Sequence, residues 1–487
     1  MTKNWIVWKI IVPWGVLIFV MLSVTTHVAA ADAVPPQGEM KLLFSDHRDI
    51  TNTWGKVHFG TSALQRLQAC ENPGFELSYC LPGTGGVWEV YGLTFKQIAK
   101  HGDQVRETNA WSVVHATTRD GVKFENVTTL YEAEPGPWTF NQAMTYNPET
   151  KEFMVLKLKM DNNGFRYTAF FSPDGRQWKE YAHNPLFYDG DAISLFWDRN
   201  LRRTVLVSKS LQFAPGGAKR IVDHGNTCRR VLVFRTSPDG RTWTPSDSME
   251  DVWNRLKRSQ GGAGFKPLPD ALLTVPDALD PPDLEFYSGN AFWYHDRSYM
   301  MVLNYAASPL VPGKHAPQMD TEWWVGRDGL SWERPGRDVN ALGDAFPGNP
   351  RITHNPMLLN GQILFRFGNC LVGMKQDRLS YVGARANAEF STTSFVMPAG
   401  ELLLNAAVPS PDRPFATQQA YVRVAVLDEK GVVIPGFEAD KCLIKTGDQI
   451  NFPLVWSGKS ARELAGKSIR LRFQLRSANI YAVTSKN

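Results

Sequence analysis

The chain has 487 residues, of which 43% are hydrophobic, 21% charged and 12% aromatic. This balance supports buried cores throughout and two or three domains. The net charge of +5 is small and spread along the chain, which excludes the basic surface of a nucleic-acid-binding protein. Five cysteines are too few and too scattered for a disulfide scaffold or a zinc cluster, although Cys70 and Cys80 are close enough in sequence to bridge a loop.

The first 31 residues have the pattern of a secretory signal. Lys3 and Lys9 precede an apolar run from Ile10 to Val24, and small residues follow around Ala31. The run is short for a membrane-spanning helix, which needs about 20 residues, although an uncleaved anchor remains an alternative. We expect cleavage, a mature chain with a charge of about +3, a secreted or periplasmic location and no stable membrane insertion.

Four segments in the middle of the chain share a small or polar residue, then Asp-Gly, then an aromatic residue three positions after the glycine. A fifth, degenerate copy lacks the glycine. The five marks are Asp120-Gly121 with Phe124, Asp174-Gly175 with Trp178, Asp239-Gly240 with Trp243, Asp328-Gly329 with Trp332, and Asp377-Arg378 with Tyr381.

Each mark follows a strand-like run, and Asp-Gly between β runs is a strong hairpin signal. The five aspartates are 54, 65, 89 and 49 residues apart, which suits the 40–50 residues of a four-stranded propeller blade plus loops. Asp-Gly turns occur in any β protein, but five copies with shared flanks favour a five-bladed β-propeller. The sequence therefore predicts an all-β chain.

We expect each blade to begin with an innermost strand along the axis. The predicted innermost strands are Val87–Tyr91, Phe140–Tyr146, Ala192–Trp197, Glu285–Tyr294 and His354–Leu359. Second strands are predicted at Glu152–Leu158, Thr204–Ser208 and Ser298–Leu303. The widest gap holds a polar insertion from about Ser246 to Pro282, with a short helix expected over Glu250–Arg258.

After Tyr381 the turn marks stop and strand-like runs continue. The runs are Glu401–Leu404, Tyr421–Leu427, Val432–Ile434 and Ile469–Leu475. In the last of these, apolar and polar residues alternate with the period of two that is typical of a half-buried strand. We therefore predict a propeller over residues 40–384 and a β-sandwich over residues 385–487.

Five blades with the Ser-Pro-Asp-Gly-x-x-Trp hairpin, followed by a sandwich, resemble the secreted bacterial propeller glycoside hydrolases of the levanase/invertase and arabinanase groups. The segments Leu402–Ala406 and Gly466–Phe473 and the end at Ala478–Tyr481 resemble sandwich strands of such proteins. The resemblance implies a carbohydrate substrate. The levanase-like Asn-Asp-Pro, Arg-Asp-Pro and Glu-Cys motifs are missing, so no catalytic residue is transferred. The hairpin also resembles the sialidase Asp-box, but has one residue fewer between Asp and Gly and no clear arginine triad.

Hydrolysis of a glycosidic bond usually takes two carboxylates, one on each side of the bond. In a propeller they must lie near the axis, at the start of innermost strands. This filter selects four candidate catalytic residues: Glu89, Asp191, Asp283 and Glu285. Asp189, beside Gly190, is interpreted as a turn residue, and each of the four also has a structural alternative as an ion-pair partner.

Side chains that could hold the sugar are expected around the same axis. Aromatic rings stack on sugars, and amide and charged groups bind hydroxyls. The candidate substrate-binding residues are Asp46, Arg48, Trp138, Asn141, Tyr287 and His354. No cofactor is expected, although His354 resembles a position near a central calcium in arabinanase-like propellers.

Three functions fit these observations. The first is a glycoside hydrolase, which predicts two or more carboxylates in one axial site. The second is a carbohydrate-binding propeller without catalysis, and the third is a protein-interaction or surface-structural propeller. The sandwich is expected to support the propeller, with glycan binding as the alternative.

Overall fold

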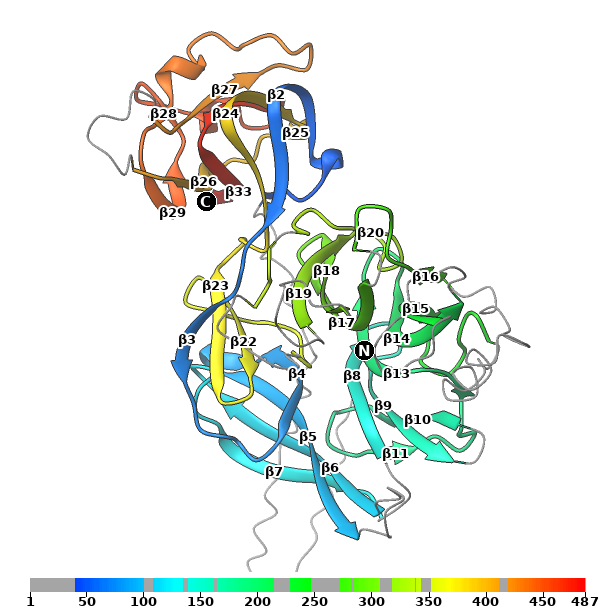
Figure 1. Cartoon of the computed structure of the whole chain (residues 1–487). Helices are drawn as coiled ribbons and strands as arrows, with labels where there is room; N and C mark the ends of the chain where they lie inside the picture. Colours follow the sequence, from blue (N-terminus) through cyan, green and yellow to red (C-terminus); the bar gives the residue numbers. More distant parts are fainter. Residues whose placement is uncertain are drawn as a thin grey trace, which may run out of the picture.

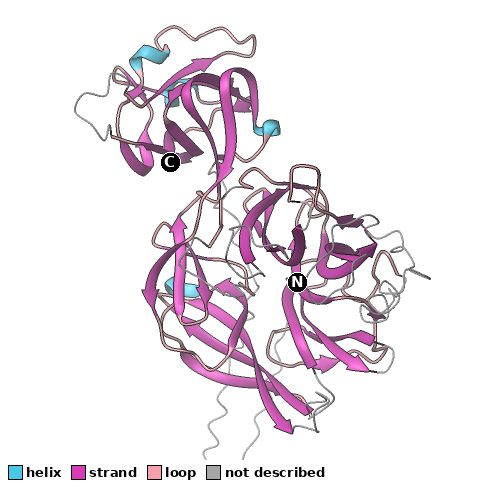
Figure 2. Cartoon of the chain, in the orientation of Figure 1, coloured by secondary structure: helices cyan, strands magenta, loops and turns pink. Residues whose placement is uncertain are grey.

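The computed structural model describes residues 40–99, 108–134, 139–161, 164–213, 228–246, 272–281, 284–306, 318–337, 339–342, 352–410 and 419–486. Strands dominate these ranges, and they form a five-bladed β-propeller joined to a β-sandwich (Figures 1 and 2). The helical elements described are four short 3-10 turns: η1 (His47–Asp49), η2 (Thr84–Gly86), η3 (Ala439–Lys441) and η4 (Ala461–Leu464). Within the described ranges, no helix is long and apolar enough to cross a membrane.

Each blade is an antiparallel sheet of four main strands. Blade I contains β4 (Glu76–Pro82), β5 (Trp88–Ala99), β6 (Thr108–Thr118) and β7 (Glu125–Glu132). Blade II contains β8 (Thr139–Asn147), β9 (Glu152–Asp161), β10 (Gly164–Ser172) and β11 (Lys179–Glu180), with β12 (Phe187–Tyr188) beside β10. Blade III contains β13 (Asp191–Asp198), β14 (Arg203–Phe213), β15 (Cys228–Ser237) and β16 (Leu272–Thr274). Blade IV contains β17 (Leu284–Tyr294), β18 (Arg297–Ala306), β19 (Gln318–Gly326) and β20 (Trp332–Glu333). Blade V contains β21 (Met357–Leu359), β22 (Gln362–Phe367), β23 (Cys370–Lys375) and β3 (Gln65–Ala69).

The first strands of the blades are the innermost ones. Strand β4 contacts β8 and β21, and β13 contacts both β8 and β17. Blade V takes its outer strand, β3, from the start of the chain and its other three from residues near 357–375. This pairing joins the two ends of the propeller, so the ring is closed by backbone hydrogen bonds.

The predicted Asp-Gly turns connect the third strand of a blade to its outer edge. In each of the four full copies, the aspartate Oδ1 accepts hydrogen bonds from the backbone N–H groups two and three residues later. The glycine of each turn has a positive φ, for example +70° at Gly175. Trp178 and Trp243 donate their indole N–H to the carbonyl of the turn glycine. The repeat is therefore a capped turn with a ring packed beneath it.

These turns also set the contact between blades. A Cβ added at Gly175 in blade II would lie 2.5 Å from the hydroxyl of Tyr91 in blade I. A Cβ at Gly121, Gly240 or Gly329 would lie 3.0, 2.8 or 2.8 Å from side chains of blades V, II and III. The backbone angle favours glycine at all four turns, and the close approach of the neighbouring blade adds to this preference.

The sandwich is a sheet of ten strands with a small extra hairpin. Its strands are β1 (Lys41–Leu43), β2 (Ile50–Thr61), β24 (Ser380–Thr392), β25 (Phe395–Val396), β26 (Glu401–Val408), β27 (Tyr421–Leu427), β28 (Leu443–Ile444), β29 (Gly447–Pro453), β32 (Ser468–Arg476) and β33 (Ala478–Lys486), and the hairpin is β30 (Val455–Trp456) with β31 (Lys459–Ser460).

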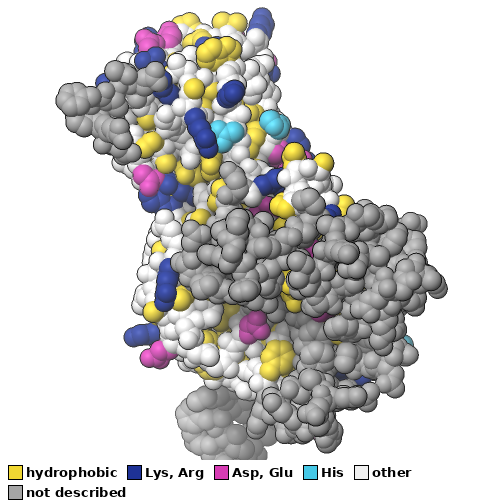
Figure 3. Space-filling view, viewed as in Figure 1, with side chains coloured by type: hydrophobic (Ala, Val, Ile, Leu, Met, Phe, Trp, Pro, Cys, Tyr) yellow, Lys and Arg dark blue, Asp and Glu magenta, His cyan; other side chains and the backbone are white. Residues whose placement is uncertain are grey.

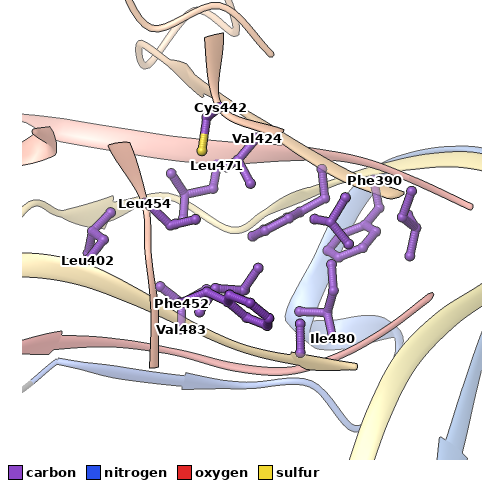
Figure 4. Close-up of a cluster of buried hydrophobic side chains, with 14 of the residues drawn as sticks. Phe390, Leu402, Val424, Cys442, Phe452, Leu454, Leu471, Ile480 and Val483 are labelled. Carbon is purple, nitrogen blue, oxygen red and sulfur yellow. The ribbon is translucent and has the colours of Figure 1, made fainter. Parts of the chain in front are cut away.

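The core of the sandwich lies on the inner side of this curved sheet, where buried side chains from strands on opposite sides point toward one another in Figure 4. Strand β32 shows the predicted alternation, with Ile469, Leu471, Phe473 and Leu475 fully buried and the residues between them partly exposed. On the face in Figure 3, basic and hydrophobic side chains are interspersed over the sandwich.

The N-terminal strands change the predicted domain boundary. Residues 41–61 pair with β33 and β24, so they belong to the sandwich and not to the propeller. The sandwich also gains Ser380 to Ala384 at the start of β24. Lys41 forms an ion pair of 2.8 Å with Asp377, which accepts a hydrogen bond from Tyr294 of blade IV. The fifth, degenerate turn is therefore where the chain leaves the propeller.

The all-β class and the five blades are confirmed, as are the predicted innermost strands of blades II, III and IV. The prediction for blade I was wrong, because Val87–Tyr91 lies in the second strand, β5, and β4 is the innermost one. Val432–Ile434 forms only an isolated bridge. The helix predicted at 250–258 lies outside the described residues. Cys70 and Cys80 are both free thiols, so the possible bridge between them is not formed.

Candidate functional site

The innermost strands of blades III and IV start at the same end of the propeller. Asp191 is the first residue of β13, and Glu285 is the second residue of β17, a strand that packs against β13. Because the innermost strands of all blades run in the same direction along the propeller axis, the first residues of β13 and β17 lie at the same end of that axis. Two of the predicted carboxylates therefore lie on neighbouring innermost strands at this end.

A continuous run of contacts joins these two carboxylates. Asp191 forms an ion pair of 2.7 Å with Lys209 of β14, and the Lys209 Nζ lies 4.3 Å from the centre of the Tyr287 ring. The Arg230 guanidinium of β15 lies 5.0 Å from the same ring and donates to Glu285 at 2.5 Å. Tyr287 therefore holds two cations, one for each carboxylate, through cation–π contacts. We call these five residues the axial cluster.

Burial differs along the axial cluster. The side chains of Arg230 and Glu285 are 4% and 3% exposed, and Arg230 also lies over the ring of Tyr305. The Asp191 side chain is 19% exposed. Asp191 is thus the carboxylate of the cluster that a ligand can reach, whereas Glu285 is closed in by its partner.

The local backbone explains how these residues reach the axis. A Cβ at Gly190 would lie 1.6 Å from the Lys209 carbonyl oxygen, so only glycine lets the chain pass this close before β13. A register shift follows between Asp191 and Ser194, where Ala192 has φ +55°. In β17 a second shift between residues 286 and 288 leaves Tyr287 outside the ladder. Bulges of this kind redirect side chains.

A further carboxyl lies at the same end of blade IV. Asp320 of β19 is paired in register with Asn304 of β18. Burial raises the pKa of Asp320, although a hydrogen bond with Asn304 opposes the shift. Its Oδ1 is buried, and no hydrogen-bond partner for it is found among the described residues. The sequence analysis missed Asp320, along with Lys209 and Arg230, because they lie on second and third strands and the filter took only strand starts.

Three of the predicted residues cannot be placed. Asp283 and Trp138 lie outside the described residues, and Asn141 lies in β8 but its side chain is also outside them. Each remains a prediction.

Glu89 lies away from the axial cluster. It is paired in register with Leu81, at the far end of β4 from its start, and its carboxylate contacts the Nε2 atom of His115. That hydrogen bond lowers the pKa of Glu89, although burial opposes the shift. The expected position on an innermost strand was wrong, because the strand containing Glu89 is the second of blade I.

Asp46 and Arg48 lie where the sandwich meets blade IV. Asp46 caps η1 and forms a salt bridge of 2.9 Å with Arg48 in it, and Asp46 also faces Arg327, beside an Asp-Gly turn. Burial raises the pKa of Asp46, but its hydrogen bond with Arg48 and the charge of Arg327 outweigh this and lower it to about 2. These turns are at the opposite end of the blades from the axial cluster, so the pair joins domains and is far from the predicted sugar site.

His354 uses both ring nitrogens inside the protein. Its Nδ1 atom lies 2.7 Å from the Asn355 carbonyl oxygen, and its Nε2 atom accepts the Arg366 backbone N–H at 2.9 Å. Burial lowers its pKa to about 4, so the ring is neutral. Because both ring nitrogens of this neutral imidazole form hydrogen bonds inside the protein, neither is free to bind a sugar or a calcium ion. Within the described ranges, no group of three or more His, Cys, Asp or Glu side chains could hold a metal.

A buried lysine lies at the border between blades I and II. The Lys157 Nζ is 3.9 Å from the centre of the Trp111 ring and 4.8 Å from that of Phe95. In the part of the chain that the structure describes, its Nζ has no hydrogen-bond partner. Burial lowers the pKa of Lys157 to about 5.

The strand order thus defines a five-bladed β-propeller with a β-sandwich. No protein-family model and no curated protein matches the chain. Solved structures similar to it include a glycosyl hydrolase of Bacteroides ovatus (12% identity, 64% of this chain, 88% of the other, TM-score 0.35) and a thermostable family-43 glycoside hydrolase (11%, 63%, 90%, TM-score 0.38). Another is a fructofuranosidase of Schwanniomyces occidentalis (9%, 87%, 96%, TM-score 0.35).

Proposed function

We propose that this protein is a secreted glycoside hydrolase that cleaves a polysaccharide or oligosaccharide at the axial end of blades III and IV. The observation that carries the proposal is the axial cluster, which links carboxylates of two neighbouring innermost strands at one axial end. Export is proposed from the leader pattern of residues 1–31.

The environments of the carboxyls suggest different roles. Asp191 is paired with a cation and partly exposed, which suits the ionised carboxylate that acts as nucleophile or base. The acid must keep its proton near neutral pH. Glu285 is buried and bound to a guanidinium, so we assign it a positioning role. Asp320 lies at the same end of blade IV and is paired in register with the uncharged Asn304, so we assign the acid role to Asp320, with the unplaced Asp283 as the other candidate.

The experiment measures sugar release from a panel of plant, algal and microbial polysaccharides and aryl glycosides by the mature protein. Asp191→Asn should lower kcat at least a thousandfold, and Glu89→Gln, a carboxylate at the other end, should leave it unchanged. If Asp191 is a nucleophile, azide should rescue Asp191→Ala. Asp320→Asn should keep activity only on aryl glycosides with good leaving groups, because these need no acid. A fully active Asp191→Asn variant would refute the assignment.

Carbohydrate binding without cleavage is the second candidate. It is favoured by the pairing of both cluster carboxylates with cations, since such ion pairs also serve purely structural roles. In that case the wild-type protein would bind an oligosaccharide of the panel without releasing sugar. In that case Tyr287→Ala would weaken oligosaccharide binding, and neither the wild type nor any variant would release sugar.

A further inference from the structure

The outer face of the sandwich has an exposed tryptophan at its edge. Trp54 of β2 is 66% exposed, and no other tryptophan or phenylalanine in the described ranges is as open to solvent. Among the described strands, β2 pairs with β24 alone, so it forms one edge of the sheet (Figure 1). An apolar ring in this position leaves water only when another molecule covers it. The indole of Trp54 is therefore accessible to a ligand, and nothing in the proposed hydrolysis uses it.

Trp54 begins a row of side chains that crosses four strands. It is paired in register with Glu389 of β24, Glu389 is paired with Gln474 of β32, and Gln474 is paired with Arg423 of β27. Residues directly opposite one another in antiparallel strands lie on the same face, and the alternation in β32 places Gln474 on the outer face. Neighbouring strands are about 4.8 Å apart, so the row is about 14 Å long. This length suits several linked sugars better than one.

The polar side chains of the row are held by their neighbours. Gln474 Nε2 donates to Glu389 Oε2 at 2.9 Å, and Glu389 Oε1 lies 3.8 Å from the Nε atom of Arg472. The Arg423 guanidinium lies 5.2 Å from the centre of the Tyr421 ring. Side chains that are already ordered lose less conformational entropy when they bind a ligand. The row is therefore prepared for binding.

The charge of this face is positive. The paired rows bring three arginines, Arg423, Arg472 and Arg476, together with one carboxylate, that of Glu389. Glu389 contacts Arg472. Arg423 has no hydrogen-bond or ion-pair partner among the described residues, its side chain is partly exposed, and only its Nε atom is buried. A guanidinium can donate two N–H groups to one carboxylate, so the face complements an anionic ligand.

We propose that this face of the sandwich binds an acidic polysaccharide, with a sugar ring packed on Trp54 and the carboxylate of a uronic acid on Arg423. Aromatic rings pack on the C–H faces of sugars, and an amide such as that of Gln474 binds hydroxyls. The choice of a carbohydrate rests on the proposed function, whereas the negative charge of the ligand is inferred from the arginines.

Isothermal titration calorimetry of the mature full chain with polygalacturonate and its methyl-esterified form tests the site, because the two polymers share a backbone and differ in charge. The wild-type protein should bind polygalacturonate about tenfold more tightly than the ester. Trp54→Ala should weaken binding of both polymers about tenfold. Arg423→Gln should remove most of the preference for polygalacturonate, and so should high salt.

Two variants serve as matched controls and should bind both polymers like the wild type. Val396→Ala removes another sandwich side chain that is 66% exposed. Arg202→Gln removes an exposed arginine of the propeller. Asp191→Asn should also bind both polymers normally, because Asp191 is in the other site. Trp54→Ala should release sugar from small aryl glycosides at the wild-type rate.

Equal binding of the two polymers, or undiminished binding in both Trp54→Ala and Arg423→Gln, would overturn the inference. Binding to phosphatidylserine vesicles without binding to polygalacturonate would overturn it too, and would make the face a membrane contact. A protein that releases sugar but binds neither polymer would overturn the inference and leave the proposed hydrolysis standing. A protein that binds polygalacturonate through Trp54 but cleaves no substrate would refute the hydrolysis and leave the sandwich site intact.

Discussion

The buried ion pair between Asp189 and Arg235 should be essential to the stability of the propeller. Both side chains are fully buried, and the Arg235 Nε atom lies 2.7 Å from Asp189 Oδ2. Arg235 also donates to the Pro245 carbonyl oxygen and lies 4.6 Å from the centre of the Phe187 ring. Asp189 accepts the Gly190 backbone N–H. The carboxylate and the guanidinium of this pair therefore neutralise each other and hydrogen-bond to backbone groups inside the protein.

Arg235→Met removes the cation and leaves the Asp189 carboxylate buried without a counter-ion. Breaking a buried pair in this way typically costs about 3–5 kcal/mol. A domain of roughly 300 residues unfolds with an entropy of about 0.6 kcal/mol/K. The melting temperature should therefore fall by about 5–8 °C.

Thermal unfolding followed by circular dichroism measures this change. The control is Arg202→Met, which breaks a pair with Glu149 of similar length, 2.6 Å, but with side chains 70% and 44% exposed. Exposed pairs contribute less than about 1 kcal/mol, so the control should melt within about 1–2 °C of the wild type. The double variant Asp189→Asn/Arg235→Met should regain part of the loss. An Arg235→Met variant as stable as the control would refute the reasoning.

Two further changes test the turns and the buried lysine. Gly175→Ala should lower the melting temperature clearly, because the added Cβ is strained at φ +70° and contacts the preceding blade. Gly74→Ala is the control, since Gly74 has φ +82° but open space around it. Equal losses of melting temperature in the two variants would show that only the backbone angle matters. Because the pKa of Lys157 is about 5 in the folded chain against 10.5 in the reference state, the unfolded chain binds the extra proton between these values, and stability should rise with pH across that range. Lys157→Met should remove this slope and be more stable at pH 7. Urea unfolding at pH 6, 7 and 9 measures both effects, and an unchanged slope would contradict the assignment.

Local sequence was sufficient to predict the blades. The Asp-Gly-x-x-aromatic turns are short-range structures, since the aspartate bonds to backbone groups two and three residues away. The alternation in Ser468–Arg476 is equally local, and it correctly predicted a half-buried strand. Patterns that depend only on residues a few positions apart can be recognised without knowledge of the rest of the chain.

The boundary between domains was predictable only in part. Residues 41–61 join strands more than 300 positions later, and no local pattern reports a partner at that distance. The same holds for the outer strand of blade V, which comes from the beginning of the chain. Glu89 was correctly expected to lie in a strand, but that strand was wrongly expected to be the innermost one of its blade. The position of a strand within the blade depends on which strand faces the axis, and local sequence does not show this.

The sequence by itself therefore determined the all-β class, the five blades and the carboxylates Asp191 and Glu285 as strand-start residues. Only the tertiary structure decided their partners. Lys209, Arg230 and Tyr287 come together from three strands of two blades, and His354 is closed off by the backbone of residues 355 and 366. The physical reason is that turns and alternation depend on neighbours in the chain, whereas burial and charge pairing depend on neighbours in space.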